Sequence, residues 1–445
     1  MRAWLKFLSF MTVTGCLGVS CTGRIGPAGG LLSGGGGGAD STGAGGATGT
    51  TADTTITTSG SGGGSTPATT SGGGSAGGGG GADCGGSPDD DADGDGFSED
   101  EGDCDDCNPR VNPRALELPT VGGEGGDAPE PVDDDCDGIP DNVPEPCDGD
   151  LAIDDPDPLN AARAIELCAM SSDPARWGVV SATWMKVDGS APPEAAEKLT
   201  GFHLGHGILD GFGPNVAPRG GARLLALSSG AARQDTDPDF QSPSGFAKGY
   251  SGDLPRGFPR SPRGCVDFLP GRPEDPIAVE ITIRVPSNVH GFSFNTKYNT
   301  FDWPDVVCSS FNDFFLALLS PAPPDRIDGH LLFDHEENAM SLNNAFIDVC
   351  KCQGGSPCEL GGRSFACSLG LRELLGTGFE NRAATGWLVT TAPVEPGQEI
   401  KIRWGVYDAG DGTLDSTGLI DNWQWIVEPG VPVKTMVAPP PAAEE

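Results

Sequence analysis

The stretch Ala278-Val-Glu-Ile-Thr-Ile-Arg-Val285 alternates apolar and polar side chains. Glu399-Ile-Lys-Ile-Arg-Trp-Gly-Val-Tyr407 repeats this pattern further along the chain. Because successive side chains of a β-strand point to opposite faces, such alternation is typical of a strand with one face in a core. The two stretches therefore predict that the C-terminal half of the chain is built from β-strands.

Further short runs are bounded by Gly, Pro, Asn or Asp, which favours strands joined by turns. These strands are expected near 179–187, 222–228, 291–296, 313–319, 386–391 and 420–428. Many short strands without a strand–helix–strand rhythm indicate a mainly β fold, a β-sandwich or jelly roll over 151–430. One short helix is expected at 160–170, with Asn160 as its N-cap. The tail, 431–445, is expected to be disordered.

Acidic residues are concentrated ahead of this β region. The chain has a formal net charge of −37, and residues 83–157 hold 27 Asp and Glu against 2 Arg. Such a charge repels nucleic acid and attracts cations, so nucleic acid is excluded as a partner. A solvated acidic linker is the simpler alternative. Apolar residues are nearly absent from 83–150, so this module needs metal or disulfides to fold.

The acids recur at ligand spacing rather than in a plain run. Asp91-Ala-Asp-Gly-Asp-Gly-Phe97 and Asp133-x-Asp-x-Asp-Gly-x-x-Asp141 both place carboxylates at alternate positions around a glycine turn. Ca²⁺ takes six to eight oxygen ligands, which such loops supply. A register that starts at Asp89 fits an EF-hand loop, but no flanking amphipathic helices are visible. The predicted ligands are Asp91, Asp93, Asp95, Glu99, Asp103, Asp105, Asp106, Asp133, Asp135, Asp137 and Asp141.

The module resembles the MopE-like metal-binding motif of bacterial surface proteins over about 91–141. The matching steps are Asp91–Phe97, Gly102-Asp-Cys-Asp-Asp106, Pro113-Arg-Ala-Leu-Glu117 and the Asp-Cys-Asp-Gly run that ends at Gly138. The resemblance implies that Cys104 and Cys136 pair. The family name suggests copper, yet residues 83–150 contain no His or Met, which copper sites favour. Calcium is therefore the predicted cofactor, and copper is the weaker alternative.

The β region resembles the choice-of-anchor L domain, a bacterial extracellular domain, over about 175–430. The resemblance rests on the run from Phe294 to Asp305, on Phe311-Asn-Asp-Phe-Phe315, on the run from Val394 to Arg403, and on the aspartates from Asp408 to Asp415. It implies an exported surface protein and no particular activity. Four cysteines between 350 and 367 depart from the pattern and suggest a disulfide-linked insertion, with zinc as the weaker alternative.

The N-terminus has the pattern of a lipoprotein signal peptide, expected at 1–21. Arg2 and Lys6 precede an apolar stretch that is too short to span a bilayer. Lipidation is expected at Cys21 or Cys16. Residues 22–82 are rich in Gly, Ser and Thr and are expected to form a disordered tether. The mature protein is therefore expected to be exported and lipid-anchored at the outer membrane or cell surface, where disulfides form.

Three smaller groups carry weaker hypotheses. Asp408, Asp411 and Asp415 either bind a second cation or form a turn. His203 and His206 are expected to be loop histidines rather than a metal pair. Tryptophans at 404, 423 and 425 either form the sandwich core, which is favoured, or a surface for sugar stacking.

No nucleophile elbow, P-loop or dinucleotide motif is present, so a binding function is favoured over an enzyme. The predicted function is a calcium-binding surface protein that adheres to a glycan or an envelope protein. The alternatives are an extracellular glycan hydrolase with structural calcium and a copper-scavenging surface protein.

Overall fold

The computed structural model describes residues 84, 86–120, 130–172, 176–265 and 271–440. The described residues all lie within the compact unit Ala76–Glu445. The predicted signal peptide and nearly all of the tether, with Cys16 and Cys21, lie outside the described residues. In the described part, no helix is long and apolar enough to cross a membrane.

The fold is mainly β, as the alternating stretches predict. The strands are β1 (Gly178–Met185), β2 (His206–Leu209), β3 (Leu224–Ser228), β4 (Pro273–Arg284), β5 (Gly291–Thr300), β6 (Phe314–Ser320), β7 (Ile347–Val349), β8 (Cys358–Leu360), β9 (Arg363–Phe365), β10 (Ala383–Thr385), β11 (Leu388–Pro393), β12 (Glu399–Ala409), β13 (Ser416–Ile426) and β14 (Lys434–Val437). The helices are η1 (Glu99–Glu101), α1 (Pro158–Arg163), α2 (Ala196–Leu204) and η2 (Arg372–Leu374).

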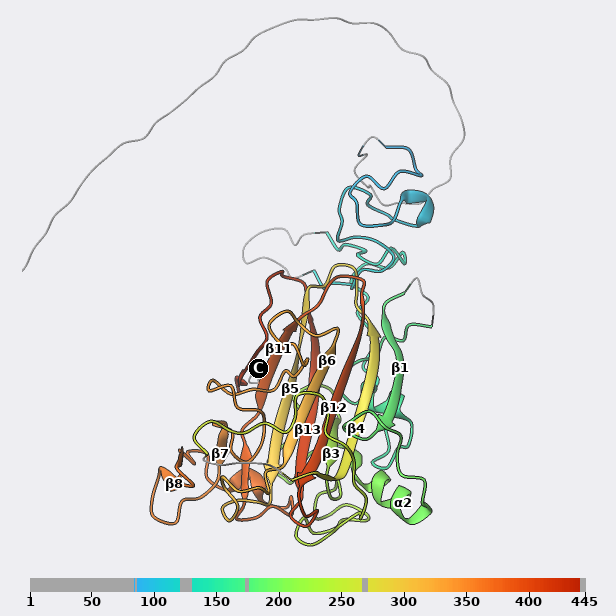
Figure 1. The fold of residues 1–445 in the computed structure, drawn as a ribbon. Coiled ribbons are helices and arrows are strands. Elements are labelled where there is room, and N and C mark those ends of the chain that lie inside the picture. Colours follow the sequence, from blue (N-terminus) through green and yellow to red (C-terminus); the bar gives the residue numbers. More distant parts are fainter. Residues whose placement is uncertain (1–83, 85, 121–129, 173–175, 266–270, 441–445) are drawn as a thin grey trace, which may run out of the picture. The chain divides into compact units, whose positions relative to one another are not determined.

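Two antiparallel sheets form the sandwich. One has the strand order β1-β4-β12-β6, and the other has the order β14-β11-β5-β13-β3-β2, with β10 beside β5 and β7 beside β10. Figure 1 shows the long strands of the two sheets, with β4 beside β12 in one and β5 beside β13 in the other. The connections from β12 to β13 and from β5 to β6 each pass from one sheet to the other.

The register of β4 against β12 explains the alternation seen in the sequence. Ile402 lies opposite Ile281 and Trp404 opposite Val279, and all four side chains are fully buried. On the other face of the same strands, Arg403 lies opposite Glu280 and forms an ion pair with it at 2.5 Å. One face of the sheet therefore supplies the core, and the other carries the polar residues.

Aromatic side chains fill the space between the two sheets. Trp404 of β12 makes an edge contact with Phe294 of β5 at 5.3 Å between ring centroids. It makes another with Trp423 of β13 at 6.1 Å. Trp404 and Trp423 are therefore mainly core residues, which confirms the favoured interpretation for these two and removes Trp404 from any sugar-binding surface.

Two local expectations were wrong. The helix expected at 160–170 begins at Pro158, because the Asp157 side chain caps it by accepting a hydrogen bond from the Leu159 amide. It ends at Arg163, and Glu166 then takes a left-handed backbone with φ of 67°. The tail expected to be disordered from 431 contains β14, because its backbone pairs with β11 and Thr435 bonds to Thr390 at 3.0 Å. Residues 441–445 lie outside the described part.

Six disulfides link the twelve cysteines from Cys84 onward. The pairs are Cys84–Cys107, Cys104–Cys136, Cys147–Cys168, Cys265–Cys308, Cys350–Cys367 and Cys352–Cys358. The pair Cys104–Cys136 is the one that the family resemblance implies. The pairs between 350 and 367 use the thiols that a zinc site would need, so this insertion is linked by disulfides.

Candidate metal centre

Glycines and short turns shape the first acidic loop. Both carboxylate oxygens of Asp91 accept hydrogen bonds from backbone amides, from Gly94 at 2.7 Å and from Gly96 at 3.0 Å. The two glycines have φ of 84° and 100°, a backbone conformation that residues with a Cβ atom rarely adopt. The backbone therefore turns tightly around the carboxylate, and the loop brings alternate aspartates to the same side.

Two groups of carboxylates overlap in this loop. Asp91, Asp93 and Asp95 have oxygens within 4.8 Å of one another, and so have Asp93, Asp103 and Asp106. Asp93 is common to both groups. The run that contains Cys104 is therefore brought back over the first loop, where Asp106 accepts a hydrogen bond from the Ala92 amide at 3.1 Å.

The second of these groups is short of hydrogen-bond donors. Asp93 and Asp103 each have one buried oxygen, Oδ2, that makes no hydrogen bond. Burial raises the pKa of Asp103 to about 6, and the charges of Asp95 and Asp93 add to the shift. Buried carboxylates that repel one another need a cation or protons to balance them.

The second acidic loop repeats this geometry. Asp133 accepts hydrogen bonds from the amides of Asp137 at 3.1 Å and Gly138 at 2.8 Å. The oxygens of Glu117, Asp133 and Asp135 lie within 4.8 Å of one another. Burial raises the pKa of both Glu117 and Asp135. The second loop therefore forms a third group of carboxylates.

Glu117 is a candidate ligand that was not among those predicted. It is 4% exposed, and its carboxylate accepts hydrogen bonds from the amides of Asp134 and Asp135 at 3.1 and 3.2 Å. Its place in the Pro-x-Ala-x-Glu step was visible in the sequence. Its role was missed because that step lies outside both alternating runs, and only the fold brings it to Asp133.

Four of the predicted ligands lie outside these groups. Asp141 instead holds Thr120, whose amide and hydroxyl both bond to its Oδ1 at 2.8 Å. Asp137 accepts hydrogen bonds from Ile139 and Asn142. Glu99 is exposed in η1, and Asp105 has one buried oxygen without a partner. As ligands, these four stay predictions.

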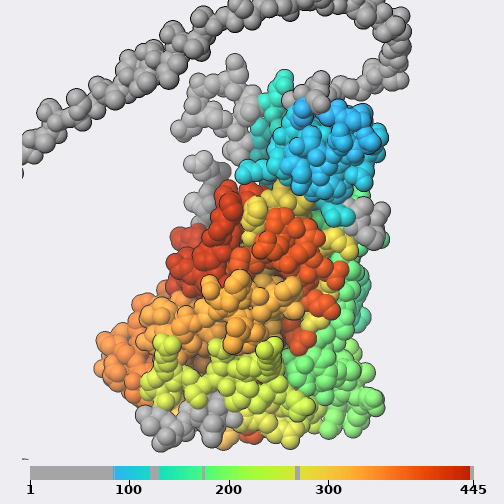
Figure 2. Space-filling model, turned by 45° about the horizontal axis from the view of Figure 1, so that its top comes forward, coloured from blue at the N-terminus to red at the C-terminus, as the bar shows by residue number. Residues whose placement is uncertain are grey.

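The acidic module has almost no apolar interior. Val111 and Ala115 are its buried apolar side chains between 86 and 120. Figure 2 shows the blue residues of this stretch gathered into one compact group. The module also bonds to the turn between β4 and β5, where Asn288 accepts a hydrogen bond from the Leu116 amide at 2.8 Å. Disulfides and these polar contacts replace an apolar core.

The aspartates at and near the β12–β13 connection differ in how far they are buried. Asp408 and Asp415 are 1% and 0% exposed, whereas Asp411 is exposed and accepts a hydrogen bond from the Thr413 amide. Asp411 therefore behaves as a turn residue. Among the described residues, these three do not form a group of oxygens within 4.8 Å.

The two histidines are not loop residues, contrary to expectation. His203 lies in α2 and His206 begins β2, and their ring nitrogens are 3.3 Å apart. His206 stacks on Trp184, and burial lowers its pKa to about 3. His206 therefore belongs to the packed interior, where neutral imidazole is favoured, whereas His203 is exposed at the end of α2.

A pocket of about 270 Å³ lies where the acidic module meets the sandwich. We call it the tryptophan pocket; it is lined by Leu116, Pro144, Pro146, Asp148, Glu166, Leu167, Cys168, Ala169, Trp177, Gly221, Trp423 and Trp425. Trp177 and Trp425 are half-buried, so their rings are partly accessible, whereas Trp423 stacks on Phe292 behind them at 4.2 Å. Aromatic faces beside carboxyl groups suit a ligand with both apolar and hydroxyl surfaces.

Glu166 is the unusual group of this pocket. Both of its carboxyl oxygens are buried and make no hydrogen bond. Burial raises the pKa of Glu166 to about 9, and the charges of Asp421 and Asp148 add to the shift. A side chain on Gly221 would collide with the carboxyl groups of both Asp148 and Glu166. Burial therefore favours the neutral, protonated form of the Glu166 carboxyl group.

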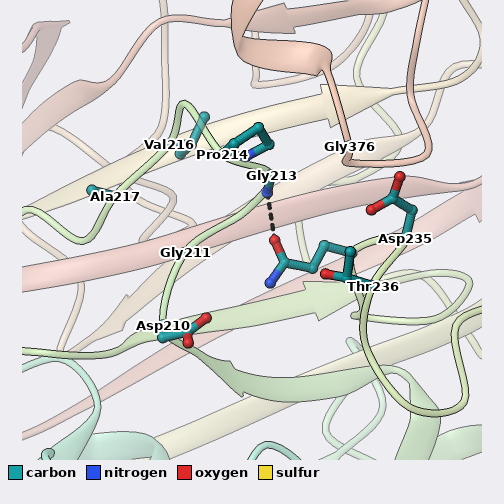
Figure 3. A pocket seen from close by; sticks show the side chains of 10 residues that line it. Asp210, Gly211, Gly213, Pro214, Val216, Ala217, Asp235, Thr236 and Gly376 are labelled. Carbon is teal, nitrogen blue, oxygen red and sulfur yellow. Dashed lines mark hydrogen bonds between the residues drawn. The ribbon is translucent and has the colours of Figure 1, made fainter.

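A second hollow, of about 600 Å³, has a different character. Figure 3 shows Asp210 and Asp235 on its rim and the hydrogen bond from the Gly213 amide to Gln234. That bond is 2.7 Å long. Glycine, proline and small side chains make up most of its remaining lining, without an aromatic ring among the lining residues. This hollow offers little for specific recognition of a ligand.

The fold and the carboxylate groups define a β-sandwich protein with an acidic, disulfide-linked module. No protein-family model matches the chain. No curated protein matches it either. Among solved structures, TmCBM61 in complex with β-1,4-galactotriose matches with 11% identity and a TM-score of 0.19, over 50% of this chain and 83% of that chain. That likeness is too slight to identify a ligand.

Proposed function

We propose that this chain is an exported calcium-binding protein whose β-sandwich recognises a ligand at the cell envelope. The observation that supports calcium is the convergence of carboxylates into three groups within 4.8 Å in the acidic module. Buried oxygens of Asp93 and Asp103 without hydrogen bonds add to it. A cation with many oxygen ligands would balance these charges and supply the folding free energy that the module lacks from apolar burial.

Calcium is favoured over copper by the chemistry of the ligands. All the side chains in the three groups are carboxylates, which are hard oxygen donors. Residues 83–150 contain no His or Met, and the cysteines in the described part of the module are in disulfides. Copper retained by the protein in excess Ca²⁺ would instead support the scavenger hypothesis.

Calcium titration of the exported chain tests this function. Asp103→Asn and Glu117→Gln should each weaken Ca²⁺ affinity by about tenfold or more, because each removes a charged ligand; tenfold equals about 1.4 kcal/mol. Asp150 is exposed and lies in none of the groups, so Asp150→Asn is the matched control and should leave affinity unchanged. Equal affinity in all three variants would remove the basis for the proposal.

We assign ligand recognition to the tryptophan pocket, and the proposed ligand class is a glycan. Its volume of about 270 Å³ suits a single sugar ring more than a long chain. A sugar ring presents C–H groups that pack on aromatic rings and hydroxyl groups that bond to carboxyl oxygens. The half-buried rings of Trp177 and Trp425 offer the stacking contact, and the carboxyl-bearing residues Asp148 and Glu166 line the same pocket.

Binding to a glycan array tests this assignment. Trp425→Ala should reduce binding by about tenfold or more, because aromatic stacking of this kind contributes on the order of 1–3 kcal/mol. Trp387 is a half-buried tryptophan outside the pocket, so Trp387→Ala is the control. Binding that survives Trp425→Ala unchanged would place recognition elsewhere. Release of a shortened sugar would indicate a hydrolase instead.

The raised pKa of Glu166 predicts that the stability of the folded state depends on pH. The folded state holds this proton more tightly than the unfolded state, where the pKa is 4.5, so its contribution to stability is full below pH 4.5 and is lost as pH rises toward 9. Glu166→Gln should therefore flatten the decline in melting temperature between pH 7 and pH 9. A variant that declines as steeply as the parent would show that Glu166 does not titrate there.

The lipid anchor belongs to the same proposal and rests on the sequence alone. Cys21 or Cys16 would carry the lipid, and residues 22–82 would tether the folded part to the outer membrane or cell surface. Incorporation of a labelled fatty acid into Cys16→Ser and Cys21→Ser variants identifies the modified residue. Labelling that persists in both would exclude both sites.

A further inference from the structure

Four aspartates gather at one end of the sandwich interior. The register places Tyr407 opposite Phe314 and Ser416 opposite Thr300, so the β5–β6 and β12–β13 connections lie at the same end. These two segments carry the aspartates on either side of the gap between the sheets. We call them the interior aspartates: Asp302, Asp313, Asp408 and Asp415. They are between 0% and 2% exposed.

Three of these side chains have buried carboxyl oxygens without a hydrogen-bond partner. The buried oxygens without a partner are Oδ2 of Asp302 and both oxygens of Asp408 and Asp415. Asp313 differs, because its carboxylate accepts hydrogen bonds from the Ala409 amide at 2.9 Å and the Ser416 hydroxyl at 2.8 Å. Buried carboxyl oxygens without partners are costly, so a cluster of them needs a compensating ligand or protons.

The interior aspartates are near enough to influence one another. Burial raises the pKa of Asp415 well above its usual range, and the charge of Asp408 is the next largest cause. Burial also raises the pKa of Asp408, and the charge of Asp313 is the next largest cause of that shift. The nearby Lys248 offsets part of the charge, but its ammonium group donates a hydrogen bond to the Ser228 carbonyl at 2.9 Å. One lysine leaves most of this negative charge unbalanced.

We propose that Asp408 and Asp415, together with Asp302, bind a divalent cation of the Ca²⁺ type inside the sandwich. Oxygen ligands on both sides of the gap would then join the two sheets through the ion. Gly230 lies directly against Asp415, where any side chain would overlap the carboxylate, so the backbone leaves room for it. No three of these carboxylates, within the described part of the chain, converge within 4.8 Å. Binding therefore requires a side-chain rotation or a main-chain carbonyl ligand.

This site is distinct from the metal groups of the acidic module. It differs also from the cation site that the sequence suggested at Asp408, Asp411 and Asp415. The proposed ligands include Asp302 and leave out Asp411, which lies in the exposed turn. A module without bound calcium would leave this proposal standing, and the two sites must therefore be measured separately.

Calorimetry of the exported chain in Ca²⁺ and in EDTA tests the proposal. We expect saturating Ca²⁺ to raise the unfolding temperature of the sandwich by about 5–10 °C. Asp415→Asn should abolish this shift, whereas Asp411→Asn, at the exposed turn, should keep it. Asp103→Asn should also keep it, because that substitution affects the module alone. Native mass spectrometry should show fewer bound Ca²⁺ ions in Asp415→Asn than in Asp411→Asn.

The alternative, protons instead of a cation, predicts the opposite results. The sandwich would then unfold at the same temperature in Ca²⁺ and EDTA, and Asp415→Asn would be as stable as the parent or more stable in both. That outcome would overturn the proposal. If Asp415→Asn fails to fold, Asp408→Asn takes its place in the calorimetry. Tb³⁺ luminescence of the Asp103→Asn variant then provides a second test of cation binding. The Tyr298 hydroxyl oxygen lies 2.9 Å from Oγ of Ser416, beside Asp415, so this ring would sensitise a bound Tb³⁺. Absence of Tb³⁺ emission would count against the site.

Discussion

Removing Ca²⁺ with EDTA at neutral pH should unfold residues 86–150 while the β-sandwich stays folded. The module has little apolar interior, with Val111 and Ala115 as its buried apolar side chains between 86 and 120, and its carboxylates repel one another once the cation is gone. A ligand present at about 1,000 times its Kd stabilises the state that binds it by about 4 kcal/mol. Loss of that free energy would exceed what so small a core provides.

Limited proteolysis and hydrogen exchange measure this result directly. In EDTA, amides between 86 and 150 should lose protection, and those of β4, β5, β12 and β13 should keep it. The double variant Cys104→Ser with Cys136→Ser should need more Ca²⁺ for the same protection, because the disulfide limits the unfolded chain. Mg²⁺ is the control ion, since it prefers a smaller octahedral site. Equal protection in EDTA and Ca²⁺ would mean that disulfides alone hold the module.

The strands were predictable where a local pattern determines them. The alternation in 278–285 and 399–407 reports which side chains face the core, and the structure pairs these two stretches in register. The short strands β2, β7 to β10 and β14 were missed because they have three or four residues, too few to show a period. Their pairing is determined by contacts with distant strands rather than by their own sequence.

The candidate sites were predictable only in part, for a similar reason. Carboxylates that alternate along one loop, such as Asp91, Asp93 and Asp95, converge because the loop itself brings them together. Glu117 reaches Asp133 through a fold in the chain, and no local spacing reports that. Asp302 and Asp415 likewise come from different connections between the sheets. Glu166 gives no sequence signal at all, because its unusual environment arises from burial beside Gly220 and Gly221.

Replacing Trp404 by alanine should cost the sandwich about 3–5 kcal/mol in free energy of unfolding, the range for removing a large aromatic side chain from a core. Trp404 is fully buried and contacts Phe294 and Trp423 across the gap between the sheets. Denaturant unfolding in constant Ca²⁺ measures the change. Phe311 is 38% exposed, so Phe311→Ala should change stability by only about 0.5 kcal/mol.

The same variant shows how far the two parts of the protein depend on each other. The module bonds to Ser287 and Asn288 of the turn between β4 and β5, through Asn112 and Leu116. If these polar contacts only position the module, Trp404→Ala should unfold the sandwich earlier and leave the Ca²⁺ affinity of the module unchanged. If affinity falls in parallel with stability, the module depends on the folded sandwich, through this turn, for its Ca²⁺ affinity.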